Sequence, residues 1–284
     1  MALWPGHERA FEPFSQLFYF LISFRHKTIL SFHNERFMDD LNAHGKFWKI
    51  LAIFFMNHID RFIVDNQYCK ELATSILNRN ARIIVIPEYI PEQVVPQLKE
   101  DTILALRKKC KYLLSSNAFQ ISFYENQDLY GLDILVELVN CLINVHGLDV
   151  GMVFLLPNIG DIGYFSEINR RIKHYGLSNR FYIITSPVES AVSVWKISDI
   201  VIRATNTDGN SLTVLEALSM NVPVIASDCS ERPEGTIIFR TRDVEDLCEK
   251  VRMVLSHLEF YRSKLVYISK TDNAANLLRL YKNI

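Results

Sequence analysis

The sequence predicts an α/β protein whose parallel sheets are covered by helices on both faces, and three observations support this. Short β-branched runs alternate with segments of helical periodicity along most of the chain. Hydrophobic residues make up 49% of the chain and charged residues 22%, which is typical of a globular protein. The length of 284 residues is enough for two domains, each with its own core. We therefore expect doubly wound, Rossmann-like domains.

The N-terminal part is expected to form a small domain over 1–96. Apolar runs predict strands, and longer apolar or amphipathic segments predict helices. The predicted strands are 28–32, 62–64 and 81–86, and the predicted helices are 14–24, 47–59 and 68–78. Pro87 and Pro91 make the next segment a stiff loop, which is typical of a domain border.

The remainder, 97–284, is expected to form the larger domain with the same alternation. The predicted strands are 119–123, 152–156, 181–184, 199–203 and 222–226. The predicted helices are 97–115, 135–145, 164–175 with Gly176 after its end, 189–197, 212–220 ending at Asn221, 243–256 and 271–281.

The segment 199–228 (DIVIRATNTDGNSLTVLEALSMNVPVIASD) carries the strongest functional signal. It predicts a strand, a polar loop with Asp208 and Gly209, a helix capped by Ser211, and another strand. Leu212, Leu215 and Leu218 are predicted to form the apolar face of that helix. A helix N-terminus beside a glycine suits a phosphate group. The carboxylates of Asp208 and Glu216, eight positions apart, suit the hydroxyl groups of a ribose and a sugar.

This segment resembles the donor-binding segment of the family 4 glycosyltransferases, which have the GT-B fold. The family pattern E-G-F-G-L-x-x-L-E-A is matched by 208–217 (DGNSLTVLEA), and P-V-V/I-A-S-D is matched by 223–228 (PVIASD). The alternative is that this segment is an ordinary βαβ unit whose helix has an acidic face. The resemblance implies a UDP- or GDP-linked sugar as donor and no cofactor or metal. It also implies a last helix that crosses back onto the N-terminal domain.

The resemblance further implies roles for individual residues. Glu216 would hold the ribose hydroxyls, and Asp208 would face the transferred sugar as a catalytic residue. Backbone N–H groups of the segment Gly209, Asn210, Ser211 and Leu212 would meet the phosphates.

Two departures from the family pattern concern the diphosphate. The arginine and lysine that normally hold it correspond here to Glu125 and Tyr130. Arg203 and, as a second candidate, Arg232 lie at the same predicted sheet edge and would supply the missing charge. The loop 203–211 (RATNTDGNS) is similar to an R-P-T-x-x-D-G-x-S loop in a bacterial subset of the family. The alternatives are that the site is degenerate, or that the arginines form ordinary surface ion pairs.

The N-terminal part resembles the family only weakly. His33 follows the strand 28–32 at the position where many members carry a histidine near the donor and acceptor, so we predict a catalytic role for it. A histidine that only caps the strand is the alternative. The glycine-rich N-terminal loop of the family has no counterpart before His33. The domain is therefore expected to be reduced, or the chain is a piece of a longer protein.

Composition bears on partners and location. Eleven of the eighteen phenylalanines precede Val64, and 14–24 is an apolar run followed by Arg25, His26 and Lys27. A buried helix packed on a sheet is the favoured interpretation, and an interfacial helix over 14–27 on a membrane is the alternative. The near-neutral net charge of −1 gives no nucleic-acid signature. Five cysteines without C-x-x-C spacing predict reduced thiols in a cytoplasmic protein, and no metal cluster.

These observations favour a retaining glycosyltransferase at the cytoplasmic face of the cell membrane. It would transfer a sugar from a nucleotide-sugar donor to a polysaccharide or lipid-linked glycan acceptor. A second hypothesis is a non-catalytic or incomplete partner subunit that depends on another protein for the missing N-terminal half. A sugar-nucleotide epimerase of the same fold is a third.

Overall fold

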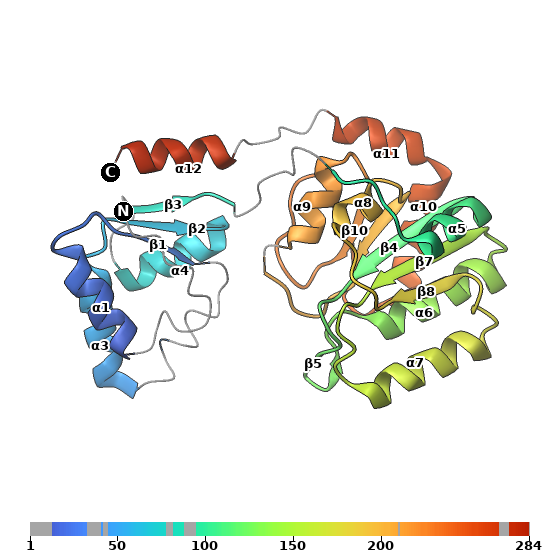
Figure 1. The fold of residues 1–284 in the computed structure, drawn as a ribbon, viewed down its shortest axis with the longest axis horizontal. Coiled ribbons are helices and arrows are strands. Elements are labelled where there is room, and N and C mark those ends of the chain that lie inside the picture. Colours follow the sequence, from blue (N-terminus) through green and yellow to red (C-terminus); the bar gives the residue numbers. More distant parts are fainter. Residues whose placement is uncertain are drawn as a thin grey trace. The chain divides into compact units, whose positions relative to one another are not determined.

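The computed structural model describes residues 13–32, 41, 45–77, 82–87, 95–209, 211–266 and 273–283. The chain divides into two compact units (Figure 1). Unit 1 consists of Met1–Ile90 with Thr271–Ile284, and unit 2 of Pro91–Lys270. Among the described residues, no helix combines the length and the apolar character needed to cross a bilayer.

Unit 1 contains a three-stranded parallel sheet in the order β1-β2-β3. Its strands are β1 (Ile29–Phe32), β2 (Arg61–Val64) and β3 (Ile83–Val85), and its helices are α1 (Pro13–Ser23), α3 (Gly45–Met56), α4 (Gln67–Leu77) and α12 (Asn273–Lys282). The core is formed by apolar side chains of the sheet with α3 and α4, among them Phe62, Met56 and Ala73. The strands and helices expected between 28 and 86 are confirmed to within a few residues.

The favoured expectation for α1, a helix buried on the sheet, is wrong. α1 packs beside α3, where the rings of Phe20 and Phe55 lie 4.7 Å apart. Its outer face is exposed, with Phe18 at 53% and Leu21 at 58%, and Phe24, just after the helix, is 66% exposed. The helix is apolar on more than one side, so a single partner helix leaves part of its apolar surface uncovered.

Unit 2 contains a six-stranded parallel sheet in the order β11-β10-β9-β4-β7-β8. Its strands are β4 (Tyr112–Asn117), β7 (Val150–Leu155), β8 (Phe181–Ile184), β9 (Ile200–Arg203), β10 (Val224–Ser227) and β11 (Ile237–Phe239). A separate hairpin is formed by β5 (Phe123–Tyr124) and β6 (Gln127–Asp128).

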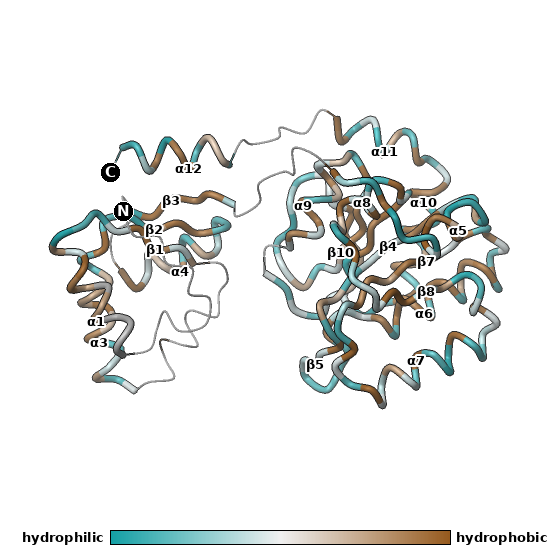
Figure 2. The backbone as a smooth tube through the Cα atoms, in the orientation of Figure 1, coloured by the Kyte–Doolittle hydropathy of each residue, from teal (hydrophilic) through white to brown (hydrophobic). Residues whose placement is uncertain are grey.

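The helices of unit 2 cover both faces of the sheet (Figure 1). They are α5 (Asp101–Lys109), α6 (Leu132–Asn140), the π-helical turn η2 (Cys141–Val145), α7 (Ile162–His174), α8 (Ala191–Trp195), α9 (Leu212–Ser219), α10 (Val244–Ser256) and α11 (Leu258–Leu265). One core lies between the sheet and α6, η2, α7 and α10, and the other between the sheet and α5, α8 and α9. Hydrophobic residues accordingly concentrate in the central strands (Figure 2).

The expectation of one helix over 97–115 is wrong, because α5 ends at Lys109 and β4 begins at Tyr112. β4 lies between β7 and β9 and is buried on both faces, so it has no alternating pattern. The expected strand 119–123 is reduced to a single bridge, Gln120 to Asn158, and the start of β5. β11 and α11 were not predicted.

The strand order places a topological switch point between β4 and β9. From β4 the chain proceeds through β7 and β8 to one edge, and from β9 through β10 and β11 to the other. The helices that follow β4 and β9, α6 and α9, therefore lie on opposite faces of the sheet. Open α/β sheets bind ligands at this place, and here β4 ends at Asn117 and β9 at Arg203.

Candidate functional site

The loop that follows β9 is held at the carboxyl edge of the sheet by hydrogen bonds to its main chain. The Ser227 hydroxyl, at the end of β10, donates to the Thr205 carbonyl over 2.6 Å. The Asn206 N–H donates to the Leu129 carbonyl over 3.1 Å. These contacts fix the loop between β10 and the segment before α6, so the side chains that it carries are positioned by two neighbouring elements.

Asp208 of this loop belongs to a buried group of three charged side chains, with Arg203 at the end of β9 and Arg232 after β10. The Asp208 carboxylate accepts two hydrogen bonds of 2.9 Å from Nε and Nη2 of Arg203. It also accepts one of 2.7 Å from Nη1 of Arg232. The exposed fractions of the side chains are 12% for Arg203, 9% for Asp208 and 2% for Arg232. We refer to Arg203, Asp208 and Arg232 as the charged cluster.

The cluster keeps its members ionised. Burial acts to raise the pKa of Asp208, but the hydrogen bonds and charges of Arg203 and Arg232 outweigh it and hold the pKa below its usual value. Burial likewise acts to lower the pKa of Arg203, and the bonds to Asp208 outweigh it, so that pKa is raised. The cluster therefore remains charged at neutral pH.

Arg203 occupies the place where the sequence lacks a cation. Its guanidinium carbon lies 5.2 Å from the ring centroid of Tyr130, in a cation–π contact. Tyr130 stands at the position where the family 4 glycosyltransferases, which this sequence resembles, have a lysine. Arg203 bonds Asp208 through Nε and Nη2, and among the described residues no acceptor contacts its Nη1. Nη1 is therefore the donor that Arg203 can offer to a ligand.

Arg232 has the opposite character, because the protein saturates its donors. Besides Asp208, they reach the Ser227 carbonyl at 3.0 Å, the Ser227 hydroxyl at 3.1 Å and the Thr205 hydroxyl at 3.2 Å. A side chain that is 2% exposed and bonded in this way holds Asp208 in place. The geometry does not favour the expected phosphate contact of Arg232.

The N-terminus of α9 faces the same edge of the sheet. The expected cap, Ser211, precedes the helix but makes no side-chain capping bond. Its hydroxyl is buried and has no hydrogen-bond partner among the described residues. Thr213 is anchored to Asn117 at the end of β4 by a 2.8 Å hydrogen bond. Gly209 lies in the loop before the helix, and Asn210 lies outside the described residues.

The expected apolar face of α9 is wrong. Leu212 is 45% exposed, and the buried positions are Thr213, Val214 and Ala217. These three positions form the face of the helix that packs on the core. A threonine can lie in this face because its hydroxyl has Asn117 as a hydrogen-bond partner. Asn221 ends the helix region as expected, with a positive φ of 57°.

Glu216 lies on α9 next to α8. Its Oε2 accepts a 2.8 Å hydrogen bond from the indole N–H of Trp195, which is fully buried. This bond orients the carboxylate. It was not predicted from the sequence, because Trp195 lies in another helix. An oriented, half-buried carboxylate is suited to accept hydrogen bonds from the hydroxyl groups of a ligand.

The start of α6 also belongs to this region, and it lies at Leu132 rather than at the expected position 135. Gly131 has a φ of +68°, and a Cβ at this position would lie 2.4 Å from the Ala204 carbonyl oxygen. Asp128 is buried and accepts from the N–H groups of Tyr130 and Leu132. Burial raises its pKa. Only a glycine allows the start of α6 to approach the β9–α9 loop so closely.

Two further predicted positions are Glu125 and His33. Glu125, with Asn126, forms the turn of the β5–β6 hairpin with positive φ and an exposed side chain. His33 lies outside the described residues.

Comparisons with known proteins show which proteins this chain is similar to in sequence and fold. The family described as Glycosyl transferases group 1 matches residues 126–257. The search of curated proteins gave no match. HepE of Anabaena in complex with UDP is 14% identical, with a TM-score of 0.66 over 93% of this chain and 71% of HepE.

Two other solved structures are similar at the same level. A glycosyltransferase from Rickettsia africae is 15% identical, with a TM-score of 0.60 over 100% of this chain and 84% of its own. The GtfA/B complex is 14% identical, with a TM-score of 0.67 over 95% of this chain and 55% of its own. The chain thus has the fold of the GT-B glycosyltransferases, with the group 1 segment over residues 126–257.

Proposed function

We propose that this protein is a retaining glycosyltransferase that uses a UDP- or GDP-linked sugar as donor. The observation that carries the proposal is the guanidinium of Arg203 over the ring of Tyr130. It returns a cation to a position where the sequence has lost one, beside the N-terminus of α9. UDP in the complex of Anabaena HepE supports a nucleotide donor.

Each residue of the site then has a chemical role. Nη1 of Arg203, the Ser211 hydroxyl and the N–H groups at the start of α9, with Gly209, Asn210 and Leu212, bind the diphosphate. Glu216 binds the ribose hydroxyls. Asp208, enclosed between two arginines, positions Arg203 rather than touching the sugar, and His33 stays a proposed contact on the acceptor side.

The reaction breaks the bond between the sugar C1 and the phosphate oxygen, and the nucleoside diphosphate leaves with the bonding electrons. An acceptor hydroxyl oxygen forms the new bond to C1 and releases its proton. Negative charge grows on the leaving diphosphate, where fixed donors lower the barrier. Arg203 and the start of α9 supply such donors.

Calorimetry with UDP- and GDP-linked sugars, without added metal, tests the donor site. We expect micromolar binding by the wild-type chain and a large loss in Glu216→Ala. Glu137→Ala serves as the control. Glu137 lies on α6 and pairs with Arg171 of α7 and with Tyr175 directly after α7, and it belongs to none of the proposed donor contacts. Equal affinities of the wild type and Glu216→Ala would refute the assignment of Glu216.

The proposed acceptor is a polysaccharide or lipid-linked glycan at the inner face of the cell membrane. Its support is the exposed apolar surface of α1 and α3, with members between 42% and 80% exposed. These are Leu17, Phe18, Leu21, Phe24, Phe47, Ile50 and Phe54. Neither helix contains an acidic residue, and Arg25, Lys46 and Lys49 lie among or beside the apolar positions. Apolar rings flanked by basic residues suit an anionic lipid surface.

Flotation with phosphatidylglycerol vesicles checks this surface. The wild-type chain should float with these vesicles and remain behind with phosphatidylcholine vesicles. The double variant Phe47→Ser/Ile50→Ser should lose flotation, because both side chains are exposed and contribute apolar area. Phe260→Ser, which removes a 53% exposed ring of α11 in unit 2, should float like the wild type. Flotation of the double variant would exclude this face as the membrane contact.

The second candidate is a partner subunit that does not transfer sugar by itself. The lack of cations at Glu125 and Tyr130 favours it, and the likeness to the GtfA/B complex is in keeping with it. Absence of any nucleotide-sugar binding in the calorimetric experiment would favour this candidate over the enzyme. The next step would then be co-purification of a partner.

A further inference from the structure

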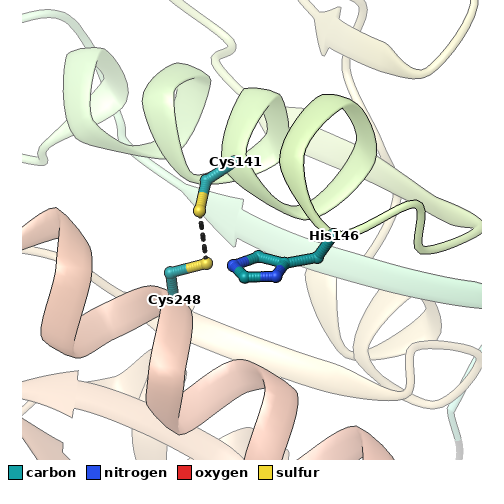
Figure 3. Close-up of side chains that lie close together, drawn as sticks. All are labelled: Cys141, His146 and Cys248. Atoms are coloured by element: carbon teal, nitrogen blue, oxygen red, sulfur yellow. Dashed lines mark hydrogen bonds between the residues drawn. The ribbon is translucent and has the colours of Figure 1, made fainter.

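Two cysteines and a histidine come together on the face of unit 2 that α6 and α10 cover. Cys141 and His146 border η2 at the end of α6, and Cys248 lies on α10, 107 residues further along the chain from Cys141. The two sulfurs are 2.7 Å apart, and all three ligand atoms lie within 4.8 Å of one another. Their side chains point toward one another (Figure 3). The sequence predicted scattered thiols at these positions and no metal cluster.

The backbone is shaped so that the histidine faces the cysteine. The His146 N–H donates to the Cys141 carbonyl over 3.1 Å, five residues back, which defines a π-helical turn. In an α-helix, residue i+4 lies on nearly the same side as residue i, whereas residue i+5 points to a different side. The wider π-helical turn brings residue 146 toward the side of residue 141. Single π-helical turns are rare and often occur at functional sites.

We propose that Cys141, His146 and Cys248 form a zinc site with three protein ligands and one open position. Two thiolates and an imidazole are ligands that Zn²⁺ prefers, and a three-ligand site accepts water as the fourth. Cys248 is buried, Cys141 is half-buried and His146 is exposed, so the ion enters from the side of His146.

Binding requires small and balanced changes. Tetrahedral zinc with Zn–S bonds of about 2.3 Å holds its sulfurs about 3.7 Å apart, so the pair opens by about 1 Å. As the two Zn–S bonds form, each thiol releases its proton to water. Burial and the neighbouring Cys141 raise the pKa of Cys248 to about 12, against the charge of Arg252 one turn away. Without metal, Cys248 is therefore a neutral thiol.

A disulfide between Cys141 and Cys248 is the rival use of the same sulfurs. It would leave His146 without a role and would not need the π-helical turn that orients this residue. The metal site uses all three side chains. It would join the end of α6 to α10, roughly 15 Å along α6 from the end that borders the charged cluster. At this distance we expect the metal site to act independently of the donor site.

Titration of the reduced 284-residue chain with Co²⁺, followed by competition with Zn²⁺, tests the proposal. We expect one ion per chain, with the visible band of tetrahedral Co²⁺ and a thiolate charge-transfer band. Both should vanish in Cys248→Ser. Cys110→Ser is the matched control, because Cys110 is equally buried and lies on the other face of the sheet, and it should bind like the wild type.

His146→Asn guards against loss of the fold, because His146 is exposed. We expect its Zn²⁺ affinity to fall more than about 100-fold, since changes outside the ligands alone cost about 10- to 100-fold. Zn²⁺ should raise the melting temperature of the wild type and not that of His146→Asn. Absence of the cobalt bands in the reduced wild type, or unchanged affinity in His146→Asn, would overturn the proposal.

Discussion

The free energy of unfolding of unit 2 is expected to fall by about 3–5 kcal/mol when Asp208 is replaced by alanine. The carboxylate is 9% exposed and is the shared partner of Arg203 and Arg232, whose side chains are 12% and 2% exposed. Removing it leaves two buried guanidinium groups without their counter-charge. Their desolvation is then uncompensated, which is the costly way to break a buried ion pair.

Urea denaturation followed by tryptophan fluorescence measures this loss. Trp4 and Trp48 are changed to phenylalanine, so that buried Trp195 reports on unit 2. Glu259→Ala is the control. Glu259 also pairs with an arginine, Arg262, but is 86% exposed, so its removal should cost less than about 1 kcal/mol. Equal effects of the two substitutions would show that the cluster does not stabilise the fold.

The charged cluster also makes the stability of unit 2 depend on pH. The pKa of Asp208 is lowered in the folded state, so the unfolded chain takes up the proton first as the pH falls. The stabilisation by Asp208 is therefore complete above its unfolded pKa of about 3.9. It is lost as the pH falls from there through the lower folded pKa. The stability difference between wild type and Asp208→Ala should shrink in this acid range and be constant near neutral pH.

Affinity for a nucleoside diphosphate is expected to fall about 10- to 150-fold in Arg203→Gln, which corresponds to the loss of a charge-assisted hydrogen bond of about 1.5–3 kcal/mol. Arg203 is the member of the cluster with a donor that no described residue engages. It also lies over Tyr130 at the switch point of the sheet. Glutamine keeps a hydrogen-bonding group for Asp208 while removing the charge.

Two comparisons sharpen this measurement. Affinity for the nucleoside without phosphates should change little, because the base and ribose contacts lie elsewhere. Arg180→Gln should bind the diphosphate like the wild type, since Arg180 pairs with Asp149 at the far edge of the sheet. If Arg203→Gln lowers nucleoside and diphosphate affinity equally, the guanidinium does not bind the phosphates.

The sequence predicted the layered α/β architecture because its signal is local. Strands such as 181–184 and helices such as 243–256 have clear periodicity and near-neighbour caps, and the structure reproduces them within one residue. β4 could not be predicted in this way. It lies between β9 and β7 inside the sheet, and its Ser115 can be buried because Ser198, 83 residues away, is its hydrogen-bond partner. A partner so distant leaves no trace in the local pattern.

The same limit explains the site. The motif around Asp208 and Glu216 could be identified from the sequence, and so could Arg203 as a replacement cation. Its contact with Tyr130 required the strand order, which places residues 130 and 203 side by side. The zinc ligands depend on a π-helical turn, and an α-helical projection of the sequence would turn His146 away from Cys141.

The charged cluster also has a consequence for the choice of solution conditions. Two guanidinium groups against one carboxylate leave one positive charge in excess at the start of α9. Polyvalent anions such as inorganic phosphate or sulfate would gather at this charge and compete with a diphosphate for Nη1 of Arg203. Affinities measured in phosphate buffer would then report displacement of the buffer anion. Buffers with only monovalent anions at low ionic strength would reveal the full attraction of the unoccupied site.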